Sequence, residues 1–184
     1  MARQELRHDP NSSLGDIAAS AGVTRRTIYS HFSGRAALVH DLAADSAEAI
    51  RLAMNVNQTP VQDPATALAR CVLTLWSVGD RYRTLFALAR QDCQPDRLDA
   101  LLAPARDTVA KILARGQGLG VFHAQIPPGA LSRAIEAHVM ALLDSGSSGV
   151  WIADGARAAT AALITAGVPG GDATATVHRV HCPA

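Results

Sequence analysis

The chain has 184 residues, of which 48% are hydrophobic, and its formal net charge at pH 7 is +1. A chain of this length can bury a core without support from disulfides or metals. The near-zero net charge argues against a protein coated with nucleic acid or spread on a membrane surface. Much of the hydrophobic content is alanine, which together with leucine and arginine favours helices, so we expect an all-α protein.

Cysteine usage and hydropathy narrow the class further. Cys71, Cys93 and Cys182 are far apart and form no C-x-x-C pattern, so neither a disulfide framework nor a zinc site is indicated. The sequence contains no run of about 18 apolar residues and no apolar signal segment at its start. We therefore expect a cytoplasmic protein that spans no membrane and needs no cofactor or metal.

The first helix with clear start and stop signals is predicted at residues 14–21. Ser13 and Asp16 have the spacing of a capping box, in which each side chain accepts a hydrogen bond from a backbone N–H. Ile17 lies on a narrow apolar face with helical spacing, and Gly22 ends the helix.

A second short helix is predicted at residues 25–32. Thr24 can cap it, and Ile28 and Phe32 share one face at i, i+4 spacing. Only residues 22–24 separate it from the preceding helix, and a glycine stands at that corner. Two short helices joined in this way describe a helix-turn-helix.

The second helix and its surroundings are basic. Between residues 23 and 40 there is no carboxylate, and the chain carries three arginines and two histidines, Arg25, Arg26, His31, Arg35 and His40. Such a local positive field attracts a phosphate backbone, although two adjacent arginines also suit a solvated helix face.

Residues 13–38, SLGDIAASAGVTRRTIYSHFSGRAAL, resemble the DNA-binding segment of the TetR family of transcriptional regulators. The matching elements are an Ile-Ala pair, an Ala-Gly-Val turn, a threonine cap and a Tyr-x-x-Phe motif, at Ile17-Ala18, Ala21-Gly22-Val23, Thr24 and Tyr29 to Phe32. A basic residue follows at Arg35, where the family usually has lysine. The resemblance implies an all-α fold with an N-terminal helix-turn-helix DNA-binding domain and a larger helical ligand-binding and dimerisation domain.

In function, the resemblance implies a homodimeric repressor that a small-molecule effector releases from double-stranded operator DNA. The N-terminal turn of a recognition helix meets base edges in the major groove. We therefore assign Arg25 and Arg26 to bases or adjacent phosphates, and Thr27 to a thymine methyl. Four further side chains are assigned to phosphates, which set register but carry no sequence information, namely Thr24, Tyr29, His31 and Arg35.

The segment ahead of the helix-turn-helix departs from the family pattern. The family normally has a full helix there, whereas only residues 1–8 are available here. We expect either a start further upstream or a shortened first helix that covers Ile17 and Phe32 incompletely. The alternative function is then a TetR-like ligand-binding dimer with weak or no DNA binding.

We expect a DNA-binding domain at residues 1–45, an effector-binding and dimerisation domain at 46–169, and a disordered tail at 170–184. The remaining helices are predicted from apolar spacing, caps, glycine and proline at about residues 35–54, 64–78, 81–91, 98–115, 129–143 and 154–166. Pro104 falls in the first turns of its helix and predicts a kink.

Five residues on apolar helix faces could line an effector pocket, Cys71, Trp76, Phe86, His138 and Met140, although each also suits ordinary core packing. The helices at residues 129–143 and 154–166 are candidates for dimerisation, because small residues allow helices to approach closely. Trp151 is a candidate interface anchor.

An enzyme is the rival class, and its parts are not recognisable in the sequence. Glu136 and His138 are two residues apart and point to different sides of a helix. The ligand-type residues His178, His181 and Cys182 fall in the segment expected to be disordered, so we assign no metal site.

Overall fold

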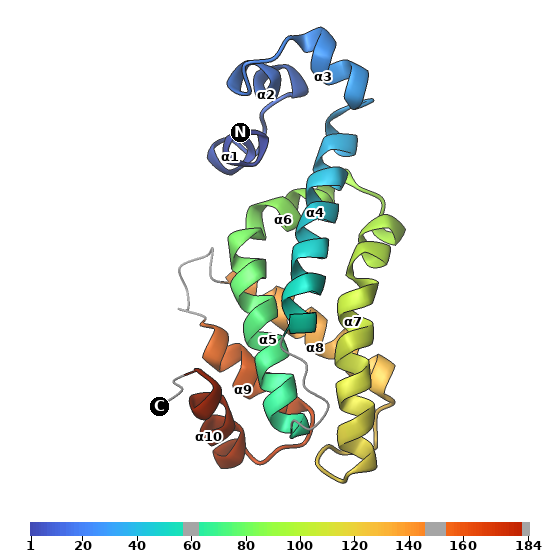
Figure 1. Cartoon of the computed structure of the whole chain (residues 1–184), viewed down its shortest axis with the longest axis vertical. Coiled ribbons are helices and arrows are strands. Elements are labelled where there is room, and N and C mark those ends of the chain that lie inside the picture. Colours follow the sequence, from blue (N-terminus) through green and yellow to red (C-terminus); the bar gives the residue numbers. More distant parts are fainter. Residues whose placement is uncertain (57–62, 146–153, 182–184) are drawn as a thin grey trace. The chain divides into compact units, whose positions relative to one another are not determined.

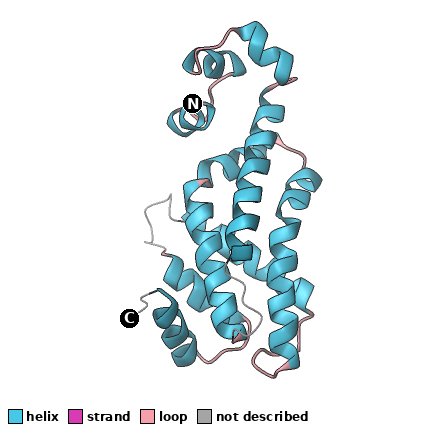
Figure 2. Ribbon diagram, viewed as in Figure 1, coloured by secondary structure: helices cyan, strands magenta, loops and turns pink. Residues whose placement is uncertain are grey.

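The computed structural model describes residues 1–56, 63–145 and 154–181, and within these ranges every regular element is a helix (Figure 2). The helices, labelled in Figure 1, are α1 (Ala2–His8), α2 (Leu14–Ser20), α3 (Arg25–His31), α4 (Arg35–Val56), α5 (Pro64–Arg81), α6 (Arg83–Asp92), α7 (Pro95–Gly118), α8 (Pro128–Ser145), α9 (Gly155–Thr165) and α10 (Gly170–His181). The expectation of an all-α protein is confirmed. Among the described helices, none has the length and apolar character needed to cross a bilayer.

The chain forms two compact units. The first comprises residues 1–48 and 82–102, and the second comprises residues 49–81 and 103–184. A single cut after residue 45 therefore does not describe the division, because α6 and the start of α7 belong with the N-terminal helices. Long-range packing of this kind leaves no signal in local composition.

The helix-turn-helix forms as its sequence predicts, with α2 and α3 joined by a short turn (Figure 1). The Ser13 hydroxyl accepts a hydrogen bond from the Asp16 backbone N–H at 3.2 Å, and the Asp16 carboxylate accepts from the Ser13 N–H at 2.9 Å, completing the capping box. Gly22 adopts φ of +70°, a left-handed conformation that favours glycine at the corner.

The first unit has one apolar core, to which distant parts of the sequence contribute. Leu6 of α1 is buried with Ile17 of α2 and Ile28 of α3, and Leu85 and Leu88 of α6 belong to the same cluster. Ile17 is fully buried, so the expectation that a short first helix would leave it poorly covered is wrong. Phe32 is only partly buried against this cluster, as expected.

In the second unit α5 packs against α8, α9 and α10, and α9 also packs against α8 and α10. Two glycines permit close approach. A Cβ at Gly79 would lie 2.7 Å from Leu143 of α8, and a Cβ at Gly155 would lie 2.9 Å from Trp76 of α5. A side chain at either position would require Leu143 or Trp76 to shift.

The boundaries of the predicted helices agree with the structure to within three residues, and the start of α7 shows what such a shift can mean. This helix begins at Pro95, three residues before its predicted start at Leu98. Pro104 therefore lies in the interior of the helix and not in its first turns. A proline at the start satisfies the helix N-terminus because its missing N–H would have had no partner there.

The expectation of a disordered tail at residues 170–184 is wrong, because residues 170–181 form α10 and bury Ala173, Thr176 and Val177. The small side chains and the glycines at its start masked an amphipathic pattern. A second signal was available, because Asp172 lies in the first turn and basic residues lie in the last, which complements the helix dipole. Trp151 and Cys182 lie outside the described residues.

Candidate nucleic-acid interface

The recognition helix α3 presents its polar face to solvent. Arg25, Arg26 and Thr27 in its first turn are exposed, and so is His31 at its end. Tyr29 is 55% exposed, whereas the neighbouring Ile28 is buried in the core of the first unit. Anchored by Ile28, the helix holds its basic first turn at the surface, as contact with base edges requires.

Thr24 and Thr27 are tied to each other at the start of α3. The Thr24 hydroxyl accepts a hydrogen bond from the Thr27 backbone N–H at 3.1 Å, and the two hydroxyl oxygens lie 2.8 Å apart. Thr24 is therefore a helix cap, as predicted. Both hydroxyls remain exposed, and the predicted phosphate and thymine contacts would have to coexist with this cap.

Arg25 lies against α2. A Cβ at Gly15 would be 3.0 Å from the Arg25 Nε, so the absence of a side chain at Gly15 leaves room for the guanidinium. The pKa of the neighbouring Asp16 carboxyl is lowered, chiefly because the Ser13 hydroxyl and the Ser13 backbone N–H donate to it, with a smaller contribution from the Arg25 charge. The side chain of Arg25 is thus oriented by α2.

Arg35 differs from the other predicted contact residues. Its side chain is 26% exposed, its Nε lies 3.3 Å from an Asp92 carboxylate oxygen, and its Nη2 donates a hydrogen bond to the Pro10 carbonyl. The guanidinium therefore has two intramolecular partners. Neither Asp92 nor Pro10 was singled out from the sequence, because this junction joins residues far apart in the chain.

The five residues predicted to line an effector pocket are divided between the two units. Phe86 is buried in the first unit, and the other four lie in the second. Cys71 is buried on α5, where burial raises the pKa of its thiol to about 12. For Cys71 and Phe86 this burial agrees with the core-packing alternative.

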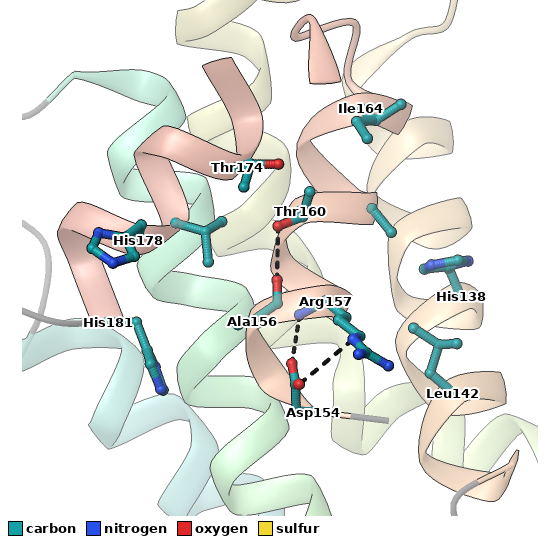
Figure 3. A pocket seen from close by; sticks show the side chains of 12 residues that line it. His138, Leu142, Asp154, Ala156, Arg157, Thr160, Ile164, Thr174, His178 and His181 are labelled. Carbon is teal, nitrogen blue, oxygen red and sulfur yellow. Dashed lines mark hydrogen bonds and ion pairs between the residues drawn. The ribbon is translucent and has the colours of Figure 1, made fainter. Parts of the chain in front are cut away.

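A pocket of about 560 Å³ opens over α9, and His138 is the member of the predicted set that lines it. Figure 3 shows Thr160 and Arg157 of α9 between His138 and Leu142 of α8 on one side and His178 of α10 on the other. Helix α9 contributes small side chains, Arg157, and Ile164, which is 50% exposed. This surface combines apolar and polar side chains.

An exposed basic helix, set by a glycine turn on a small core within an all-helical chain, defines a helix-turn-helix DNA-binding protein. Residues 10–42 match the family model described as bacterial regulatory proteins, tetR family. Residues 10–42 therefore carry a TetR-type DNA-binding segment, as the N-terminal sequence predicted.

Solved structures of TetR-type regulators share the fold. PfmR from Thermus thermophilus superposes with a TM-score of 0.73 and 16% identity, covering 91% of this chain and 95% of that one. RolR, solved with resorcinol, gives a TM-score of 0.73 and 21% identity over 97% of this chain and 89% of its own. LfrR from Mycobacterium smegmatis, solved with proflavine, gives a TM-score of 0.64 and 22% identity over 89% of this chain and 88% of its own. No curated protein sequence matches the chain.

Proposed function

We propose that this DNA-binding regulator is a homodimeric repressor that a small-molecule effector releases from its operator. The observation that carries the proposal is the exposed, carboxylate-free first turn of α3, held by a complete helix-turn-helix core. Linkage requires the effector to bind better to the DNA-incompatible state, because equal affinity for both states shifts nothing.

We assign the sequence-specific contacts to Arg25, Arg26 and Thr27. An arginine in the first turn can pair with guanine through two hydrogen bonds, which discriminates by about 1–3 kcal/mol. Thr24, Tyr29 and His31 are assigned to neighbouring phosphates, which fix the register of the helix in the groove. Arg35 is left out of this set, because its guanidinium already has two intramolecular partners.

Support for an effector comes from the similar structures, since RolR was solved with resorcinol and LfrR with proflavine. Trp76, His138 and Met140, with the buried Cys71 and Phe86, stay a predicted pocket set. The pocket over α9 is an alternative location for such a ligand.

We assign the surface over α9 to a second copy of this chain, which extends the predicted dimer of α8 and α9 to include α10. The small side chains of α9 allow a partner helix to approach closely, and Ile164 supplies an exposed apolar anchor. Two recognition helices per dimer would read two half-sites, so we expect a near-palindromic operator.

The test of DNA binding is fluorescence anisotropy with duplexes from the region upstream of the protein's own gene, at two salt concentrations. We expect salt-sensitive binding that Arg26→Ala weakens by about tenfold or more, because one base or phosphate contact is lost. Arg70→Ala is the matched control, since it removes the same charge from an exposed position on α5.

Equal weakening by both substitutions would reduce the effect to overall charge and contradict the assignment of Arg26. No binding at low salt by a folded dimer would contradict the repressor proposal. It would favour the alternative function, a ligand-binding dimer that does not recognise DNA.

A further inference from the structure

Arg35 is the first residue of α4 and stands four residues after the last helical residue of α3. Its guanidinium connects two segments that are distant in sequence. One is the loop before α2, through the Pro10 carbonyl, and the other is the end of α6, through Asp92. All of these residues belong to the first unit. One side chain thus ties the entry and the exit of the helix-turn-helix to α6.

Asp92 occupies a position that needs a cation. It is the last residue of α6, where a carboxylate is disfavoured by the negative end of the helix dipole. Its side chain is only 25% exposed, and its Oδ2 atom and the Arg35 Nε atom are both inaccessible to water. Neither atom has a hydrogen-bond partner in the described part of the chain, so the 3.3 Å ion pair offsets their burial.

The contacts around the pair show that the junction is packed. The Cys93 thiol lies 3.8 Å from the Ala36 carbonyl, directly beside the ion pair. Leu88 and Ala89 from the last turns of α6 share a core cluster with Leu38 at the start of α4. A substitution at Asp92 therefore perturbs a junction that is otherwise held by apolar contacts, and need not unfold the unit.

We propose that Arg35 and Asp92 are positioning residues that hold the helix-turn-helix at the end of α6, and that Arg35 acts through this pair and not as a phosphate ligand. The inference rests on the proposed function in that the recognition helix is taken to bind DNA.

The two roles of Arg35 predict opposite effects of Asp92→Asn. If Arg35 binds phosphate, loss of the neighbouring carboxylate frees its charge and strengthens DNA binding. If the pair positions the helix-turn-helix, the same substitution lowers the fraction of molecules in the arrangement that binds DNA. The apparent affinity falls in proportion to that fraction.

The experiment uses the full chain and a duplex that the wild type selects from a random-sequence library. Anisotropy gives the affinity and its salt dependence for wild type, Asp92→Asn, Arg35→Lys and Arg35→Gln. Asp96→Asn is the matched control, because it removes the same charge from an exposed position four residues further on. Amide exchange of the free proteins provides a readout that requires no DNA.

We expect Asp92→Asn to weaken binding by about three- to tenfold with an unchanged salt slope, and Asp96→Asn not to weaken it. Arg35→Lys should also weaken binding, since an ammonium cannot reproduce the planar guanidinium geometry that reaches both partners. The double substitution Asp92→Asn with Arg35→Gln should lower the DNA affinity little more than either substitution alone. Amide protection in residues 10–35 should fall in Asp92→Asn and not in Asp96→Asn.

Tighter binding by Asp92→Asn than by wild type would overturn the proposal. Wild-type DNA affinity of Arg35→Lys would also overturn it, if Arg35→Gln at the same time showed a salt slope reduced by about 0.9. That reduction is the signature of one lost phosphate contact. If the wild type selects no duplex, the proposed function fails. Amide exchange then still tests the positioning role of the Arg35–Asp92 pair. Equal protection in Asp92→Asn and Asp96→Asn would refute that role.

Discussion

At the scale of single residues, short polar contacts order the helix-turn-helix and the first turn of α3. The capping box orders the start of α2, Gly15 leaves space for the Arg25 guanidinium, and Thr24 caps α3. Each contact satisfies a backbone N–H or directs a charged side chain. Together they fix the first turn of the recognition helix before DNA is present, which reduces the entropy lost on binding.

The Asp16 carboxyl predicts a pH dependence of stability. Its pKa is lowered below 3.8 in the folded chain, so its ionised form stabilises the fold above that pH. This contribution is lost as the pH falls through the lowered pKa. We expect Asp16→Asn to lower the thermal midpoint at pH 7 and 5, with the difference from wild type vanishing towards pH 2.

The control for Asp16 is Ser13→Ala, which removes the hydroxyl that contributes most to the lowered pKa. In that background the pH-dependent part of the Asp16→Asn effect should shrink. Thermal unfolding followed by circular dichroism measures both. A difference between wild type and Asp16→Asn that stayed constant from pH 7 to pH 2 would contradict the role given to ionised Asp16.

At the scale of elements, two helices have roles that their place in the sequence conceals. The predicted ranges for α6 and for α2 to α4 were nearly correct. No signal in the sequence around α6 indicated that this helix completes the core of the first unit. Helix α10 was missed because alanine, glycine and threonine give a weak apolar stripe. The helix is stabilised by packing on α5 and α9, since a helix of this length is marginal alone.

A substitution at Val177 tests whether α10 packs on the rest of the second unit. Val177→Ala should lower the free energy of unfolding by about 1–3 kcal/mol, because it leaves a cavity where a buried side chain packed. Urea unfolding at equilibrium measures the loss. Ala175→Ser, at an exposed position of the same helix outside the pocket, should change it little. Equal stability of the Val177 variant and wild type would mean that α10 is not docked.

At the scale of the whole molecule, function depends on whether two copies associate over α9. Ile164→Glu should convert a dimer to a monomer, because it places a charge on an exposed apolar residue of the proposed interface. Sedimentation velocity would measure the change. DNA affinity should fall by about tenfold or more, since the two heads would no longer bind as one unit.

Leu119→Glu is the control for dimerisation, since it makes the same kind of change at an exposed aliphatic residue after α7. It should leave the sedimentation coefficient and the DNA affinity unchanged. If Ile164→Glu remains a dimer with wild-type affinity, the interface lies elsewhere. The pocket over α9 would then be available to a small molecule.

The sequence by itself determined the helical class, both helix caps, the glycine turn and the exposed basic face of α3, and with these the likeness of the N-terminal segment to TetR-type regulators. These features depend on spacing within a few residues, where hydrogen bonding and side-chain direction are local. Only the tertiary structure decided that α6 joins the head, that α10 packs on the body, and that Arg35 pairs with Asp92. Such contacts join residues far apart in the chain, and their free energy comes from burial and charge pairing that exist only once the chain is folded.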